Sequence, residues 1–224
     1  MSAILRNLNL AYISAPKCAC TSVKELVFRL ENDCNFNKIR DNKNAIRLHI
    51  NGKRHYIHHF YPTIAYHDQP QQILKQLKCF CVVRNPLDRL VSCYRNRVLQ
   101  YKELRSERIT DLGIDAPPDP DLNVFIQYLD EYQKSPQIYH HSLPLTHFLG
   151  NNPETYAKIF NLNNINQLPG YLKQYFGRSR PINHLQKSGS EIKPKRTRDL
   201  LSKQSIEQIE LRYSDDFDCF GRYF

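Results

Sequence analysis

Apolar residues gather in two short runs, and each run leads into a segment whose apolar residues have helical spacing. The first run, residues 11–14, holds β-branched and aromatic side chains and is typical of a buried strand. Thr21 or Ser22 can cap a helix after it. The apolar positions of this helix are Val23, Leu26, Val27 and Leu30. The pattern predicts a strand, a tight turn and a helix.

The second run repeats this arrangement. Residues 79–83 form a continuous apolar stretch, which is typical of a parallel strand covered on both faces, with Cys79 and Cys81 as small core residues. Pro86 suits the first turn of a helix. The apolar residues that follow at helical spacing are Leu87, Leu90, Val91, Tyr94 and Val98. We expect this helix to continue to about Tyr101.

Weaker patterns predict the remaining elements. They are a short helix over 71–77, a helix over 122–132, a strand over 156–160 and a helix over 165–176 that is interrupted near Pro169-Gly170. A last helix begins with a capping box of Ser205 and Gln208 and ends near Tyr213.

Three other stretches carry turn or loop signals. Asn51-Gly52 is a type I′ turn signal between the alternating residues 46–50 and a partner strand at 56–60, so we expect a strand pair there. Residues 102–120 are charged and then rich in proline and aspartate, which predicts a flexible loop. Residues 177–198 are basic and irregular, and we expect a loop that serves a nucleotide or an acceptor.

Strands that alternate with helices predict an α/β fold. We expect one domain over residues 1–224, with a P-loop-like, three-layer arrangement of a central parallel sheet flanked by helices. In such sheets ligands bind beyond the carboxyl ends of the strands. Lys17 and Arg84 each follow a predicted strand. If these strands are neighbours, the two cations face one crevice.

Composition narrows the possible partners. The chain has 224 residues, of which 41% are hydrophobic and 24% charged, so it can form a packed core. The formal net charge of +10 favours an anionic partner such as a nucleotide, a polyanionic glycan, a nucleic acid or an acidic membrane. A basic surface without a dedicated ligand is the alternative.

Cysteine usage and hydropathy bear on the compartment. The seven cysteines are an odd number, and neither C-x-C pair has the C-x₂-C spacing of common zinc sites, so we expect no metal. With no signal peptide in view, we expect a reducing, cytoplasmic context. No apolar run approaches the ~20 residues that span a membrane, so we expect no transmembrane segment.

The turn after the first strand has the features of an anion site. Residues 15–20 lie between a strand and a helix N-terminus, where backbone N–H groups point outward and the helix carries partial positive charge. Lys17 and the hydroxyls of Thr21 and Ser22 would suit a phosphate-like group. An ordinary strand-to-helix connection with a surface lysine is the alternative.

Four motifs carry a resemblance to a known family. The turn Ala15-Pro-Lys-Cys-Ala-Cys-Thr-Ser22 resembles the 5′-phosphosulfate-binding loop of the sulfotransferases that use 3′-phosphoadenosine 5′-phosphosulfate. Val83-Arg-Asn-Pro-Leu-Asp-Arg-Leu-Val-Ser-Cys-Tyr-Arg95 resembles their 3′-phosphate motif, in which an arginine and a serine eight residues later hold the phosphate. Asn183-His-Leu-Gln-Lys-Ser188 resembles the late nucleotide loop. Ile209-Glu-Leu-Arg-Tyr-Ser-Asp-Asp-Phe-Asp218 resembles the closing helix of the carbohydrate-type branch, with its Tyr-x-x-Asp-Phe signature.

The resemblance, closest to the branch that includes heparan sulfate 2-O-sulfotransferases, implies sulfuryl transfer to a hydroxyl by in-line displacement. The nucleotide-binding residues that it implies are Pro16, Lys17, Cys18, Ala19, Cys20, Thr21, Ser22, Arg84, Ser92, Lys187 and Ser188. Lys17 and the loop N–H groups would stabilise the charge that develops on the leaving oxygen. A kinase is the rival hypothesis, but the glycine-rich Walker loop is absent, since residues 1–51 contain no glycine.

Such a reaction needs a general base, and histidine is suited to the role near neutral pH. The family's base follows the strand before the 3′-phosphate motif, which points to His59, with His58 as the alternative. His140 and His141 are competitors that we expect at the acceptor site. His184 lies in the late loop, where it would support the nucleotide or a glycan anion.

The implied partners follow from the same resemblance. The product is 3′-phosphoadenosine 5′-phosphate, and the expected acceptor is a carbohydrate or a glycolipid. The short chain, without membrane anchor or lumenal disulfide pattern, predicts a bacterial enzyme. A non-catalytic polyanion-binding module is a further alternative, but the 14 tyrosines are dispersed and form no stacking platform, so we expect no nucleic acid partner.

Overall fold

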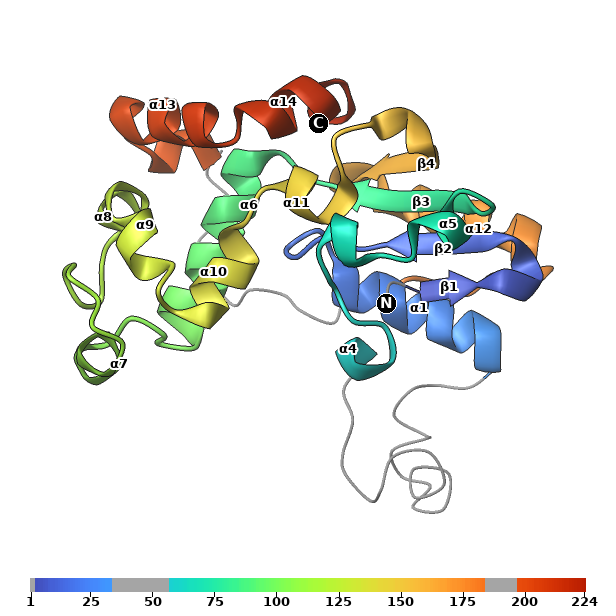
Figure 1. The fold of residues 1–224 in the computed structure, drawn as a ribbon, viewed down its shortest axis with the longest axis horizontal. Helices are drawn as coiled ribbons and strands as arrows, with labels where there is room; N and C mark the ends of the chain where they lie inside the picture. The colour runs from blue at the N-terminus through green and yellow to red at the C-terminus, as the bar shows by residue number, and fades with distance from the viewer. Residues whose placement is uncertain (1–2, 34–56, 184–196) are drawn as a thin grey trace, which may run out of the picture. The chain divides into compact units, whose positions relative to one another are not determined.

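A computed structural model describes residues 3–33, 57–183 and 197–224 (Figure 1). The chain divides into two compact units, and each is described by itself. The sheet unit comprises residues 1–83 and 148–186 with Tyr223. The helical unit comprises residues 84–147 and 187–222 with Phe224. The single domain expected from the sequence stays a prediction.

The sheet unit is built on a mixed, mostly parallel sheet. Its strands in the described residues, in spatial order, are β1 (Ala3–Leu5), β2 (Leu10–Ile13), β3 (Lys78–Val83) and β4 (Tyr156–Asn161). β2, β3 and β4 are parallel, and β1 is antiparallel to β2. With the helices that flank it (Figure 1), this sheet confirms the predicted α/β class and the strands predicted at 11–14, 79–83 and 156–160. β1, which the sequence did not indicate, is too short to show a pattern.

The two central strands are apolar because both of their faces are covered. All four residues of β2 are buried, and β3 is buried beyond Lys78. Tyr12 and Phe80 are register partners whose rings stack at 5.1 Å. Phe80 also meets the edge of Tyr171, at 5.7 Å, from helix α12 (Leu168–Phe176). These aromatic contacts fix one face of the sheet against α12.

The parallel register brings the carboxyl ends of β2 and β3 to one edge of the sheet. Ile13, the last residue of β2, pairs with Cys81 of β3. After β2 the chain enters helix α1 (Cys20–Asn32) through a short loop. After β3 it passes directly into the helical unit at Arg84. The two strands are therefore neighbours, as the prediction of an anion site required.

The other helices of the sheet unit are short. They are α4 (Ile57–Phe60) and α5 (Gln71–Leu74), with 3-10 turns at Arg6–Leu8, Tyr66–Asp68, Pro153–Thr155 and Leu162–Gln167. The helix predicted over 71–77 thus ends early. Pro169 falls in the first turn of α12, so Pro169-Gly170 does not interrupt that helix.

The return strand expected at residues 56–60 is wrong. Residues 57–60 form helix α4, while the rest of the expected strand pair, with Asn51-Gly52, lies outside the described residues. The reason is packing against α1. Ile57 is buried against Phe28, and the ring of Phe60 meets the ring of Phe28 at 6.0 Å. Tertiary contact overrides the weak preference of this short apolar stretch.

The helical unit begins with α6 (Pro86–Cys93), which continues as a π-helical segment, Tyr94–Gln100, so the helix predicted to about Tyr101 is confirmed in extent. The other helices are α7 (Ser106–Asp111), α8 (Leu122–Gln127), α9 (Leu129–Tyr132), α10 (Pro136–Ser142), α13 (Lys203–Arg212) and α14 (Ser214–Phe220). Two 3-10 turns span Thr197–Leu200 and Gly221–Tyr223. Helix α11 (Leu145–Leu149) leads back to the sheet unit.

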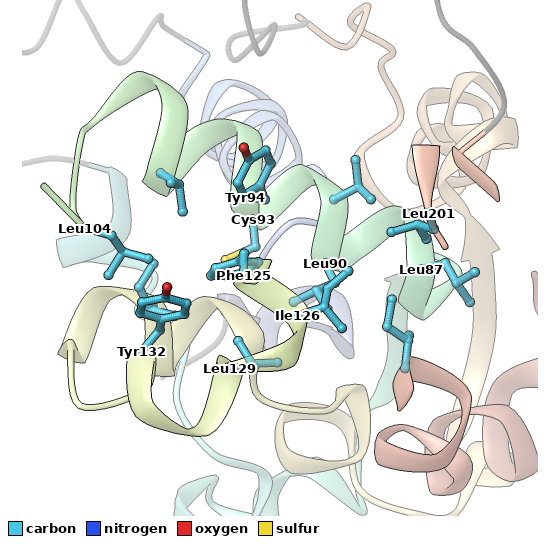
Figure 2. Packing of buried hydrophobic residues seen from close by; sticks show 14 of the residues in the cluster. Leu87, Leu90, Cys93, Tyr94, Leu104, Phe125, Ile126, Leu129, Tyr132 and Leu201 are labelled. Carbon is cyan, nitrogen blue, oxygen red and sulfur yellow. The ribbon is translucent and has the colours of Figure 1, made fainter. Parts of the chain in front are cut away.

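The core of the helical unit joins α6 to α8 and α9. Figure 2 shows Leu90 beside Ile126, within a cluster of buried apolar residues that includes Tyr94. The rings of Phe125 and Tyr132 stack at 5.8 Å. The loop predicted over 102–120 contains helix α7, because Ile109 is buried in this same cluster.

The start of the last predicted helix also needs correction. Ser202 is the cap, and its hydroxyl accepts a hydrogen bond from the Ser205 backbone N–H at 3.1 Å. Ser205 lies inside α13, where its hydroxyl donates to Asn123 at 2.8 Å. The expected box of Ser205 and Gln208 is therefore one turn too late. The end of the helix near Tyr213 is confirmed.

Three buried polar residues, Arg89, Tyr213 and Asp216, form a polar hub in the helical unit. Asp216 accepts hydrogen bonds from the backbone N–H groups of Leu145, at 2.7 Å, and Thr146, at 2.9 Å. Arg89 donates to the carbonyl of residue 143, and Tyr213 to that of residue 142. Burial raises the pKa of Asp216, while Arg89 and the hydrogen bonds oppose that shift. The Tyr-x-x-Asp-Phe signature thus anchors the end of α10 and the start of α11.

We expect Asp216→Ala to lower the free energy of unfolding by about 2–3 kcal/mol, because it leaves buried N–H groups without an acceptor. Urea unfolding followed by circular dichroism measures the change. Asp218→Ala is the matched control, since Asp218 is exposed on the same helix and its loss should change stability by less than about 0.5 kcal/mol. Equal losses in the two variants would contradict the structural role of Asp216.

Candidate functional site

The loop between β2 and α1 has an unusual backbone. Lys17 has φ 65° and Ala19 has φ 54°, so two non-glycine residues adopt the left-handed conformation. Each such residue costs on the order of 1 kcal/mol, and strain of this kind gathers at functional sites. The chain enters α1 through Ala19, the N-cap residue, and the helix begins at Cys20. The packing around the loop, in which Pro16 and Cys18 are buried, holds this geometry.

The expected cap of this helix is wrong. Thr21 and Ser22 both lie inside the first turn of α1, and within the described residues no side chain caps its N-terminus. Because Ala19 is the N-cap residue and the helix begins at Cys20, both hydroxyl residues have helical backbone, whereas a capping residue stands just before the helix. Ala19, the N-cap residue, makes no side-chain hydrogen bond to this helix start, and helix N-termini of this kind bind anions. The half-buried Lys17 adds a cation to the same loop.

His58 connects α4 to the first turns of α1. Its Nε2 lies 2.9 Å from Thr21 Oγ1, and its Nδ1 lies 3.2 Å from Lys24 Nζ. His59 is the next residue of α4, and it is exposed. Of the two histidines that the sequence offers as the base, His58 is therefore the one that contacts the first turn of α1, through Thr21.

Lys24 is a buried residue beside His58 that the sequence did not single out. It has 0% exposed surface, and its Nζ donates a hydrogen bond to Thr63 Oγ1 at 2.6 Å. Thr63 Oγ1 lies 2.8 Å from the hydroxyl of Ser14, the residue after β2. Burial lowers the pKa of Lys24 to about 8, and Cys20 acts in the opposite direction. The available signal was a lysine one turn before the apolar Val27 and Phe28 on the buried side of α1.

The two residues proposed for the 3′-phosphate belong to the helical unit. Arg84 directly precedes Asn85, whose side chain caps α6 by accepting from the Leu87 N–H at 2.9 Å. Pro86 begins the helix, as predicted. Arg84 and Ser92 are both half-buried. The geometry confirms the local strand-to-helix connection at Arg84, and its nucleotide role stays a prediction.

The second histidine pair lies on α10. His141 is held through both nitrogens: Nε2 lies 2.8 Å from an Arg97 nitrogen, and Nδ1 lies 2.7 Å from the Gln137 carbonyl. The rings of His140 and His141 are 5.1 Å apart and nearly perpendicular. These residues belong to the helical unit, whereas α4 belongs to the sheet unit. His184, Lys187 and Ser188 lie outside the described residues.

The described cysteines are free thiols. Cys79 and Cys81 are buried in β3, as predicted, and burial raises the pKa of Cys79 to about 11. Across residues 3–33, 57–183 and 197–224, no group of three or more histidine, cysteine, aspartate or glutamate side chains is arranged to hold a metal ion. None of the helices described is long and apolar enough to cross a membrane.

Comparison with known proteins gives one match, at the level of the family. A model of the sulfotransferase family matches residues 3–223, a range that includes the loop after β2 and the α6 motif. No curated protein and no solved structure matches the chain. The expected resemblance is confirmed at the level of the family, while the carbohydrate-type branch stays a prediction. Because the match extends over nearly all of its residues, the chain belongs to the sulfotransferase family.

Proposed function

We propose that this sulfotransferase uses 3′-phosphoadenosine 5′-phosphosulfate as donor and a carbohydrate hydroxyl as acceptor. The observation that carries the proposal is the loop between β2 and α1, where Lys17 precedes a helix N-terminus without a side-chain cap. When bound, the donor supplies an activated sulfuryl group with a nucleotide phosphate as leaving group. The formal net charge of +10 suits this anionic donor.

Each motif has a defined task in this proposal. Lys17 and the first-turn N–H groups of α1 stabilise the negative charge that develops on the leaving oxygen, and they do so without reorganisation because the loop is already held in shape. The Thr21 hydroxyl donates to an oxygen of the phosphosulfate. Arg84 and Ser92 bind the 3′-phosphate, since an arginine gives charge-assisted hydrogen bonds to phosphate oxygens.

The contacts favour His58 over His59 as the general base. A base must come within hydrogen-bond reach of the acceptor hydroxyl, which itself must approach the sulfur held by the loop. His58 Nε2 already reaches the Thr21 hydroxyl in the first turn after the loop, whereas His59 is exposed. Once Thr21 donates to the donor oxygens, His58 Nε2 is available to the acceptor. His59, which the sequence favours, is the alternative.

The acceptor side of the proposal uses the second histidine pair and the late loop. His140 and His141 would shape the acceptor site, with His141 fixed by Arg97 and by the Gln137 carbonyl. His184, Lys187 and Ser188 are proposed contacts from the part of the chain that the structure does not describe. A carbohydrate fits these groups because hydroxyls both donate and accept hydrogen bonds.

Calorimetry with 3′-phosphoadenosine 5′-phosphate tests the donor site. We expect Lys17→Ala and Arg84→Ala each to weaken binding by about 10- to 100-fold, because each removes a charge-assisted contact. Lys75→Ala and Arg105→Ala are matched controls, since both residues are exposed, and they should bind like the wild type.

Three results would contradict the donor assignment. The first is no binding by the wild type at tens of micromolar. The second is preference for ATP with magnesium, which would favour an atypical kinase. The third is steeply salt-dependent polyanion binding without turnover, which would favour a non-catalytic module.

Substitution of the adjacent histidines tests the base. We expect His58→Ala to lower kcat by about 10²- to 10⁴-fold, the usual effect of a lost general base, and His59→Ala to stay close to the wild type. Steady-state rates with labelled donor measure both, and the affinity for 3′-phosphoadenosine 5′-phosphate should be retained. The reverse pattern would restore His59 as base. Wild-type rates in both variants would exclude both His58 and His59 as the general base.

A further inference from the structure

A chain of hydrogen bonds inside the sheet unit extends from the proposed base, His58, to buried residues that the function proposed above does not use. It joins Ser14, Thr63, Lys24, His58 and Thr21, and we call it the lysine–histidine network. Its centre is the ammonium or amine of Lys24, which has no exposed surface. Lysine is almost never fully buried unless it is paired. Here the Lys24 nitrogen meets a histidine ring and a threonine hydroxyl.

The number of N–H donors and lone pairs on Lys24 determines which ring nitrogen of His58 carries the proton. A protonated lysine has N–H donors and no lone pair, so the nearby Nδ1 of His58 must accept from it. A neutral ring then carries its proton on Nε2, which donates to Thr21 Oγ1 and cannot take a proton from an acceptor.

A neutral Lys24 permits the reverse arrangement, because the amine has a lone pair as well as N–H donors. The amine keeps an N–H for Thr63 Oγ1 and presents its lone pair to His58 Nδ1, which then carries the ring proton. The lone pair of Nε2 now faces Thr21 and the position of an incoming hydroxyl. Only this second tautomer of His58 is a competent base at Nε2.

We propose that Lys24 is a positioning residue for sulfuryl transfer, because its protonation state selects the tautomer of His58 through the 3.2 Å contact between Nζ and Nδ1. This inference rests on the proposed function, in which His58 is the base. Lys24 itself touches neither donor nor acceptor in this proposal. It acts by fixing which ring nitrogen holds the proton.

The surroundings of Lys24 bring its change of protonation state into a pH range that experiments can reach. Burial lowers the pKa of Lys24 to about 8, and the Cys20 thiol, from the same helix, opposes this shift. His58 from α4 also faces Lys24, and Thr63 adds a neutral hydroxyl. Because the pKa is lowered, the neutral amine becomes the main form as pH rises through about 8. The base-competent tautomer of His58 therefore accumulates on the alkaline side.

Nitrogen-15 NMR of the full chain, labelled on histidine, tests the tautomer without any need for activity. His58→Ala assigns the His58 signals. We expect the wild type to carry the ring proton on Nε2 at pH 7 and on Nδ1 at pH 9.5. Lys24→Met should show no such exchange. An unchanged tautomer in the wild type, or the same exchange in Lys24→Met, would overturn the proposal.

The pH profile of the enzyme gives the second readout. We expect kcat/KM of the wild type to rise about tenfold between pH 7 and pH 9, as the neutral fraction of Lys24 rises. Lys24→Met should lack this rise. Lys24→Arg should be slow at every pH, since arginine stays protonated and always donates to Nδ1. Lys173→Met, an exposed lysine of α12, is the control and should keep the wild-type profile.

The two readouts separate the possible failures. A wild-type profile in Lys24→Arg, or a retained rise in Lys24→Met, would overturn the inference. If the wild type shows the tautomer exchange but transfers no sulfuryl group, the proposed function fails and the coupling of Lys24 to His58 stands. If it transfers sulfuryl groups with a fixed tautomer, the inference alone fails. Circular dichroism checks that both variants fold, and if they do not, the wild-type NMR titration decides.

Discussion

The parallel pairing of β2 with β3 is the constraint on which the sheet unit depends. β2 has only four residues, and all of them are buried, so it has little freedom to shift its register. That register sets where the chain leaves the sheet at Ser14. The loop then reaches the start of α1 within a few residues, with Lys17 and Ala19 in the left-handed region. The strand pairing thus fixes where this loop begins.

The helical unit depends on buried polar groups as well as on its apolar cluster. Asp216 and Arg89 are both buried, and burial of charge is unfavourable unless hydrogen bonds satisfy the groups. The backbone N–H groups at the start of α11 and the carbonyl at the end of α10 satisfy them. Such a network tolerates one geometry better than others, so it fixes the turn between these helices.

Much of the fold could be predicted from the sequence because its strongest signals are local. The buried strands are continuous apolar runs, α6 has apolar residues at helical spacing, and Pro86 marks a helix start that the structure confirms. The signals that failed were short or shared between conformations. β1 has three residues, and residues 57–60 suit a strand or a helix until α1 packs against them.

The residues of the candidate site also divide into those that the sequence could predict and those that it could not. The loop with Lys17 and the histidine pair could be found because their residue types and spacing are visible in the chain. The contact between Lys24 and His58 could not, because it joins residues 34 positions apart through the packing of α4 on α1. Nor does a sequence show that Ala19 is left-handed, since glycine is the usual residue there. Side-chain contacts across the fold, rather than local pattern, made Lys24 recognisable.

The three-residue strand β1 has a consequence for the solubility of the protein. Among the described strands, it covers the edge that β2 would otherwise present, and β2 is entirely apolar. The opposite edge, β4, carries the exposed Lys158, which discourages pairing with another chain. A protein that lacks residues 3–5 would expose the unpaired N–H and carbonyl groups of β2. We expect it to aggregate by intermolecular strand addition, directly beside the loop that holds Lys17.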